Sequence, residues 1–210
     1  MKNHVATLLL SGVCAAAVAN GLENLDAFVR NVKTAKADFT QVVTAPAKGA
    51  LAPRVKTSSG TFEFSRPSHF KFVYKKPFEQ TIVADGQTLW LYDVDLNQVT
   101  SRKQAQVLNA TPAALIATAS DLKALQADFS LVNSPDKDGQ QWLLATPKSK
   151  DGQVQNVRIG FKDGTLSTLE ILDSFGQVSR MGFTGLQANP VLDASTFVFK
   201  PPSGADVVKQ

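Results

Sequence analysis

Residues 60–92 read GTFEFSRPSHFKFVYKKPFEQTIVADGQTLWLY and contain the densest run of aromatic side chains in the sequence. Successive side chains of a strand point to opposite faces, so residues of the same parity share a face. The even positions of this stretch carry Phe62, Phe64, Phe70, Phe72 and Tyr74. The pattern predicts adjacent strands with one strongly apolar face, and we expect the rest of the fold to form around them.

Arg66 has the same parity as these aromatic residues and is followed by Pro67. Because proline cannot donate to a sheet ladder, the chain is expected to bend or to lie at an edge there. A guanidinium group is costly to bury unless its donors are paired. The sequence leaves two interpretations of Arg66, a side chain turned out to solvent or a fixed polar group inside an apolar hollow.

The first residues of the 210-residue chain follow the three-part pattern of a secretory signal peptide. Lys2 precedes an apolar run over 5–13, and small residues then end at Ala19. We predict cleavage after Ala19, so that residues 1–19 form the signal peptide and residues 20–210 a single domain. The apolar run is shorter than the roughly 20 residues needed to span a bilayer, so an exported soluble protein is expected.

Cys14 is the only cysteine, and its surroundings fit a lipid attachment site poorly. Val13 stands where a small residue is needed, and Ser11 stands where leucine is usual. Removing Lys2 from the 22 basic residues leaves 21 against 18 acidic ones, a net charge of +3 without any basic run. This charge distribution argues against a nucleic-acid partner.

Three helical segments and a loop are expected outside the aromatic stretch. Over 22–33, apolar side chains recur every three or four positions, which is typical of an amphipathic helix. A strand is predicted at 35–43 and an irregular loop at 44–59. Thr111 and Pro112 suit the start of a second helix that contains Leu115 and Ile116, and a third short helix begins near Asp121.

The remaining residues alternate strands with short turns. Asp85-Gly86 indicates a tight hairpin between 81–84 and 88–92. Further strands are expected at 98–103, 129–132, 141–146, 154–161, 165–173, 178–186 and 197–200. Because strands joined by short loops must be antiparallel, we predict a large antiparallel meander. Its aromatic face is either the core of a β-sandwich or the lining of a container for an apolar ligand.

The sequence offers little catalytic chemistry. His69 is the only histidine after the signal segment, and no G-x-S-x-G motif accompanies it, so we expect a surface or edge-strand residue there. A zinc site needs several histidine or cysteine ligands. Asp93 and Asp95 lack the further oxygen ligands of a calcium loop, so a solvated loop is the expectation. We predict no catalytic residue, no metal site and no cofactor.

Several segments, taken in order, resemble the LolA family of periplasmic lipoprotein carriers in Gram-negative bacteria. The matching segments are ADFTQVV at 37–43, SRPSHFKF at 65–72, VADGQTLWLY at 83–92, TPAALIA at 111–117, TPK at 146–148, KDGTL at 162–166 and FVFKPPSGADVV at 197–208. Each segment alone is weak. Their order and spacing together are specific, and they cover nearly the whole mature chain.

The resemblance implies an unclosed antiparallel β-barrel with an α-helical lid over an apolar cavity. Arg66, the arginine of the R-P motif, is then expected to hydrogen-bond to the lid and hold the empty cavity closed. The residues expected to line a cavity for acyl chains are Phe62, Phe64, Phe70, Phe72, Ile82, Leu115 and Ile116.

The same resemblance implies a non-enzymatic, monomeric chaperone of the periplasm. Its partners are expected to be acylated lipoproteins, the inner-membrane ABC transporter that releases them and an outer-membrane receptor. Two alternatives remain. One is an outer-membrane-anchored receptor or a periplasmic lipid or lipoprotein sensor of the same fold, and an anchored receptor would need a lipid on Cys14. The other is a periplasmic hydrolase that uses His69.

Overall fold

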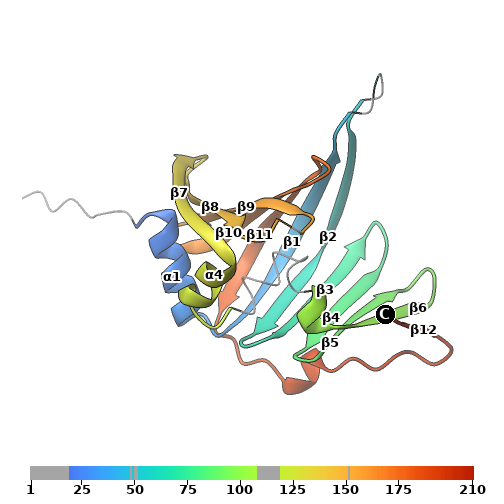
Figure 1. Ribbon diagram of the computed structural model, residues 1–210. Coiled ribbons are helices and arrows are strands. Elements are labelled where there is room, and N and C mark those ends of the chain that lie inside the picture. The colour runs from blue at the N-terminus through green and yellow to red at the C-terminus, as the bar shows by residue number, and fades with distance from the viewer. Residues whose placement is uncertain (1–18, 48, 50–51, 108–118, 151) are drawn as a thin grey trace, which may run out of the picture.

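The structure is a computed structural model that describes residues 19–47, 49, 52–107, 119–150 and 152–210 (Figure 1). The strands are β1 (Thr34–Ala45), β2 (Arg54–Ser65), β3 (His69–Lys76), β4 (Gln80–Asp85), β5 (Thr88–Asp93), β6 (Gln98–Lys103), β7 (Phe129–Lys137), β8 (Gln140–Pro147), β9 (Val154–Lys162), β10 (Thr165–Asp173), β11 (Val178–Ala188) and β12 (Asp206–Lys209). The helices are α1 (Gly21–Asn31), α2 (Gln104–Val107), α4 (Leu122–Asp128) and the 3-10 helix η2 (Ala194–Phe197).

The described strands form one sheet in the order β12-β6-β5-β4-β3-β2-β1-β11-β10-β9-β8-β7. Neighbouring strands are antiparallel except β12, which lies parallel to β6. The two ends of this order, β12 and β7, do not pair with each other, so the sheet curves without closing. This confirms the predicted unclosed barrel and excludes the β-sandwich interpretation, which needs two sheets.

Helices α1 and α4 both lie against the β7–β10 half of the sheet (Figure 1). A capping box begins α1: Asn20 Oδ1 accepts from the backbone N–H of Glu23, and Glu23 Oε2 accepts from that of Asn20. Asp121 caps α4 through a 2.8 Å bond from Ala124 N–H. Both predicted helices are confirmed, although α1 ends at Asn31, two residues earlier than expected.

Other sequence predictions lie outside the described residues or are corrected. The signal segment up to position 18 and the helix predicted from Thr111 lie outside them. The loop expected at 44–59 is wrong over much of its length, because β1 continues to Ala45 and β2 begins at Arg54. Among the described residues, no helix has the length and hydrophobicity needed to cross a bilayer.

The strand predicted at 197–200 is also wrong. Phe197 ends the 3-10 helix η2, and the chain forms its last strand only at β12. The aromatic side chains of this segment pack against other rings, and its backbone is not part of a hydrogen-bonded strand pair. Phe197 lies 5.7 Å from the His69 ring, and Phe199 lies 5.6 Å from Trp90, measured between centroids.

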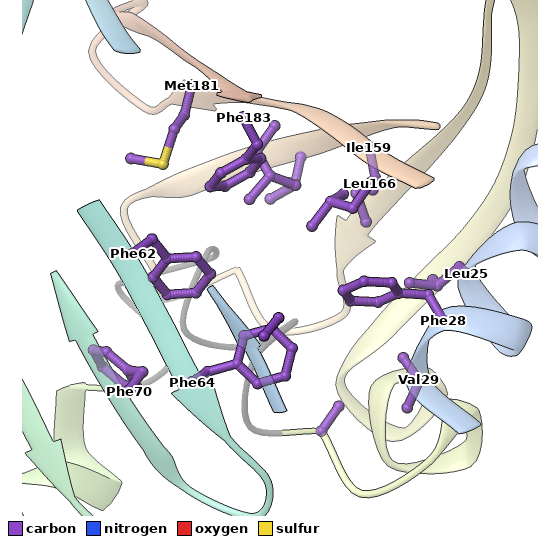
Figure 2. Packing of buried hydrophobic residues seen from close by; sticks show 14 of the residues in the cluster. Leu25, Phe28, Val29, Phe62, Phe64, Phe70, Ile159, Leu166, Met181 and Phe183 are labelled. Carbon is purple, nitrogen blue, oxygen red and sulfur yellow. The ribbon is translucent and has the colours of Figure 1, made fainter. Parts of the chain in front are cut away.

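The core lies on the concave face of the sheet (Figure 2). The alternation predicted for the aromatic stretch is confirmed, because Phe62, Phe64, Phe70 and Phe72 are all buried. The β9–β11 half of the sheet contributes further apolar side chains to the same cluster, and α1 contributes its apolar stripe. The members labelled in Figure 2 are Leu25, Phe28, Val29, Phe62, Phe64, Phe70, Ile159, Leu166, Met181 and Phe183.

Candidate functional site

Closely packed phenylalanine rings occupy the middle of the concave face. Phe62 of β2 stacks on Phe72 of β3, with ring centroids 4.3 Å apart and an angle of 21° between the planes. Phe64 and Phe183 each lie 5.7 Å from Phe62, and Phe39 of β1 meets Phe72 edge-on at 5.7 Å. Side chains from four strands, β1, β2, β3 and β11, therefore form one continuous apolar surface, which we call the aromatic cluster.

The helices cover this surface. Phe28 of α1 packs edge-on against Phe64 at 6.2 Å and against Phe161 of β9 at 6.1 Å. Leu125 of α4 is buried in the same cluster. Because Phe62, Phe64, Phe70 and Phe72 are at most 4% exposed, the face is closed in this structure. A ligand reaches these rings only if the covering side chains move.

Arg66 stands in the turn between β2 and β3, and its guanidinium is directed at the covering segments. Nε donates to the carbonyl oxygen of Val32 at 2.8 Å, and Nη1 donates to that of Ala119 at 2.6 Å. The guanidinium carbon lies 5.0 Å from the Phe64 ring centroid and 5.7 Å from that of Phe28. Of the two interpretations left by the sequence, the fixed polar group on an apolar face is confirmed.

Burial changes the acidity of Arg66. Desolvation lowers its pKa from the ordinary value for arginine to about 10. The side chain therefore stays cationic at neutral pH while most of its water is removed. Hydrogen bonds to carbonyl oxygens and the faces of two aromatic rings replace part of that hydration.

Gln104, at the start of α2, positions the turn that carries Arg66. Its side chain is 2% exposed, and its Nε2 donates to the carbonyl oxygen of Ser68 at 2.7 Å. Its Oε1 accepts from the backbone N–H of Gly86 at 3.0 Å, which ties the turn to the β4–β5 hairpin. Sequence reasoning missed this residue, because nothing in the local pattern shows that a glutamine after β6 reaches two distant turns.

The structure brings most of the predicted lining residues together. Phe62, Phe64, Phe70 and Phe72 belong to the buried cluster, and Ile82 of β4 packs against it from a partly buried position. Leu115 and Ile116 lie outside the described residues. Phe39, Phe183 and Met181 were not predicted as site residues. The alternation at 37–43 pointed to Phe39, whereas the β11 side chains join the cluster only through long-range pairing.

His69 begins β3 and lies directly opposite Asp85 of β4. Its Nδ1 lies 2.8 Å from the carbonyl oxygen of Pro67, and its ring faces Phe197. The side chain is partly exposed, as expected, although β3 is an interior strand. In the described part of the chain, no group of three or more His, Cys, Asp or Glu side chains is arranged to hold a metal ion.

An open β-barrel whose apolar face is covered by helices is suited to shelter an apolar ligand. A profile of the family described as "Outer membrane lipoprotein carrier protein LolA" matches residues 30–200. The chain belongs to this family, whose members are non-enzymatic chaperones that carry outer-membrane lipoproteins through the periplasm.

Individual relatives agree with the family match. An outer-membrane lipoprotein carrier protein of Albidiferax ferrireducens is 65% identical over 211 residues, which cover 99% of each chain. One from Methylibium petroleiphilum is 51% identical over 195 residues, covering 93% of this chain and 92% of its own. A crystal structure of a LolA superfamily protein from Nitrosomonas europaea shares the fold at a TM-score of 0.51 and 13% identity, over 85% of this chain and 96% of that one.

Proposed function

We propose that the aromatic cluster binds the acyl chains of lipoproteins while they cross the periplasm. The proposed acyl site consists of Phe62, Phe64, Phe70, Phe72, Ile82, Leu115 and Ile116. The working protein is a monomer and a single domain that begins at Asn20, after removal of residues 1–19. It receives acylated lipoproteins from an inner-membrane ABC transporter and hands them to an outer-membrane receptor.

The observation that carries this proposal is the way the cluster is covered. Phe28 and Leu125 come from two short helices, so the rings beneath them can be exposed without breaking a strand ladder. Burying a CH₂ group contributes about 0.8 kcal/mol, so a lipid anchor with several acyl chains does not leave a membrane for water unaided. An apolar surface under a movable cover keeps the acyl chains out of water.

Arg66 is proposed to hold that cover closed when the site is empty. It bonds to Val32, just after α1, and to Ala119, just before α4, so one side chain links the sheet to both covering segments. A hydrogen bond to a charged group contributes about 1.5–3 kcal/mol. Breaking these bonds on loading and remaking them on release keeps the affinity for acyl chains moderate, which a carrier that must pass on its cargo needs.

Purification from the periplasm tests the proposal. A tagged protein is isolated and analysed intact and for co-purifying molecules by mass spectrometry. We expect an unmodified N-terminus at Asn20 and co-purifying proteins with an acylated N-terminal cysteine. A diacylated Cys14 would instead indicate the anchored receptor, and a preparation without any acylated protein would contradict the carrier function.

A further inference from the structure

Along β1–β5, the concave face changes from apolar to polar at the end of these strands that lies away from Arg66. Residues directly opposite each other in an antiparallel pair point to the same face. Gln41 is opposite Ser58, Tyr74 is opposite Gln80, and Gln80 is opposite Asp93. These residues continue the parity of Phe39, Phe62, Phe72 and Ile82. One residue pair beyond the aromatic cluster, the same face is therefore polar.

A pocket of about 410 Å³ lies on this polar part of the face. Its polar lining includes Gln41, Lys56, Ser58, Tyr74, Gln80 and Asp93, and its apolar lining consists of Val43, Pro77, Phe78 and Leu96. Hydroxyl and amide groups from four adjacent strands are thus gathered next to an apolar surface. We call this hollow the polar pocket.

Tyr74 belongs to both the aromatic cluster and the polar pocket. Its ring meets Phe39 edge-on at 5.0 Å and stacks near Phe72 at 6.4 Å. Its hydroxyl donates to Gln41 Oε1 at 3.1 Å, and Gln41 Nε2 donates to Ser179 Oγ at 2.8 Å. Burial raises the pKa of Tyr74 to about 12. The apolar and polar surfaces are continuous through this residue.

We propose that the polar pocket binds the polar head of the lipid anchor, the thioether-linked glyceryl group with its ester and amide carbonyls. The inference rests on the proposed function, because acyl chains lying on the aromatic cluster place their carbonyl groups where that surface ends. Ester and amide groups are uncharged and need hydrogen-bond partners when they leave water. Gln41, Ser58, Tyr74 and Gln80 supply uncharged donors and acceptors.

The charges at the pocket favour this head over that of an anionic phospholipid. Asp93 and Asp95 both line it, while Lys56 is the cation there and lies 5.3 Å from the Phe78 ring centroid. A phosphodiester carries a negative charge that two carboxylates repel. A carrier moving between two membranes meets anionic phospholipids with the same acyl chains, so this repulsion gives it a basis for selecting lipoprotein over them.

Three probes separate the head from the chains. The purified protein is titrated with a tripalmitoyl-glyceryl-cysteine tetrapeptide, with dipalmitoyl phosphatidylglycerol and with the hydrocarbon fluorophore diphenylhexatriene. We expect Tyr74→Phe and Gln41→Met each to weaken lipopeptide binding by about threefold to tenfold, as one lost hydrogen bond does. Fluorophore binding should change by less than about twofold. Tyr92→Phe is the matched control, because Tyr92 donates to Asn97 from the other face of β5.

The charge argument has its own variant. In Asp93→Asn/Asp95→Asn, the affinity for phosphatidylglycerol relative to lipopeptide should rise by about twofold to fivefold, a small factor because both carboxylates are near solvent. Failure of the unmodified protein to bind lipopeptide would contradict the proposed function itself. If the unmodified protein binds lipopeptide and Tyr74→Phe and Gln41→Met bind it equally well, the proposal that the polar pocket binds the head group is overturned, but the proposed function is not. An unchanged ratio in the double variant would overturn the selection against phosphate.

Discussion

Arg66 donates a 2.6 Å hydrogen bond from Nη1 to the carbonyl oxygen of Ala119, the residue from which the chain leads into α4. The Nε group of the same guanidinium bonds to Val32, where the chain leaves α1. Two segments that are 87 residues apart in the sequence are therefore joined by one side chain. This geometry is what makes Arg66 the proposed latch of the helical cover.

Replacing Arg66 with leucine should slow the release of cargo. The change removes the bonds to Val32 and Ala119 and adds apolar surface beside Phe64, and both effects favour the loaded form. Loading should persist, whereas transfer to vesicles that carry the outer-membrane receptor should slow by about tenfold or more, as expected from losing at least one charged hydrogen bond. Arg66→Lys should be intermediate because an ammonium lacks the planar fork. Transfer of Arg66→Leu at the parent rate would refute the latch.

Phe72→Glu should abolish acyl binding. Phe72 stacks on Phe62 and is 3% exposed, so a carboxylate there is desolvated without a partner at a cost of several kcal/mol. Binding of a fluorescent acyl probe measures the effect, and circular dichroism establishes that the variant is folded. Phe72→Leu, which keeps the surface apolar, is the control and should retain most binding. A folded Phe72→Glu protein with normal uptake would place Phe72 outside the acyl site.

Gly60→Ala should destabilise the protein strongly. A Cβ atom at Gly60 would overlap the carbonyl oxygen of Val73, which is backbone of the paired strand β3 and cannot move aside easily. Overpacking of this kind costs about 1–3 kcal/mol or more. At Gly182, nothing lies within 4 Å of an added Cβ, so Gly182→Ala serves as the control. Urea unfolding should separate the two variants, and equal stabilities would contradict the register of β2 and β3.

The stability of the protein should fall at alkaline pH through Tyr74. Burial raises the pKa of Tyr74 from its ordinary value of 10.0 to about 12. The folded state therefore holds its proton more tightly, which contributes stability that is complete below pH 10 and is lost as the pH rises through about 12. We compare the free energies of unfolding of the parent and of Tyr74→Phe. The parent value minus the variant value should decrease by about 1–3 kcal/mol between about pH 9 and about pH 12. A constant difference would contradict the burial of this hydroxyl.

Local pattern was enough to place most strands and the aromatic face, because the alternation of Phe62, Phe64, Phe70 and Phe72 shows directly which side is buried. The first half of β2 was not predicted, because its residues do not alternate between apolar and polar. Lys56 and Ser58 are polar although they continue the concave face, so no apolar alternation marks that strand. A polar pocket on an otherwise apolar face hides its strand from any hydrophobic pattern.

Long-range contacts account for the remaining errors. β12 has four residues and exists through its pairing with β6, about a hundred positions earlier in the chain, which no local signal reveals. Phe197 and Phe199 suggested a strand, yet their rings pack on His69 and Trp90 from an irregular segment. Likewise, the alternation placed Arg66 on the correct face. Its hydrogen-bond partners Val32 and Ala119 could not be predicted, because they are distant in the sequence and are brought to Arg66 only by the tertiary structure.

Photocrosslinking from inside the cluster tests the central claim, that acyl chains lie on the concave aromatic face, most directly. A benzophenone amino acid is placed at Ile82, which packs against the cluster, and in a second protein at Tyr92 on the other face of the sheet. Each is mixed with an acylated lipoprotein or with the same protein lacking the acylated cysteine, then irradiated and analysed by mass spectrometry. The account predicts a crosslink to an acyl chain from position 82 only, and only with the acylated form. Equal crosslinking from both positions, or none to the acyl chains, would contradict it.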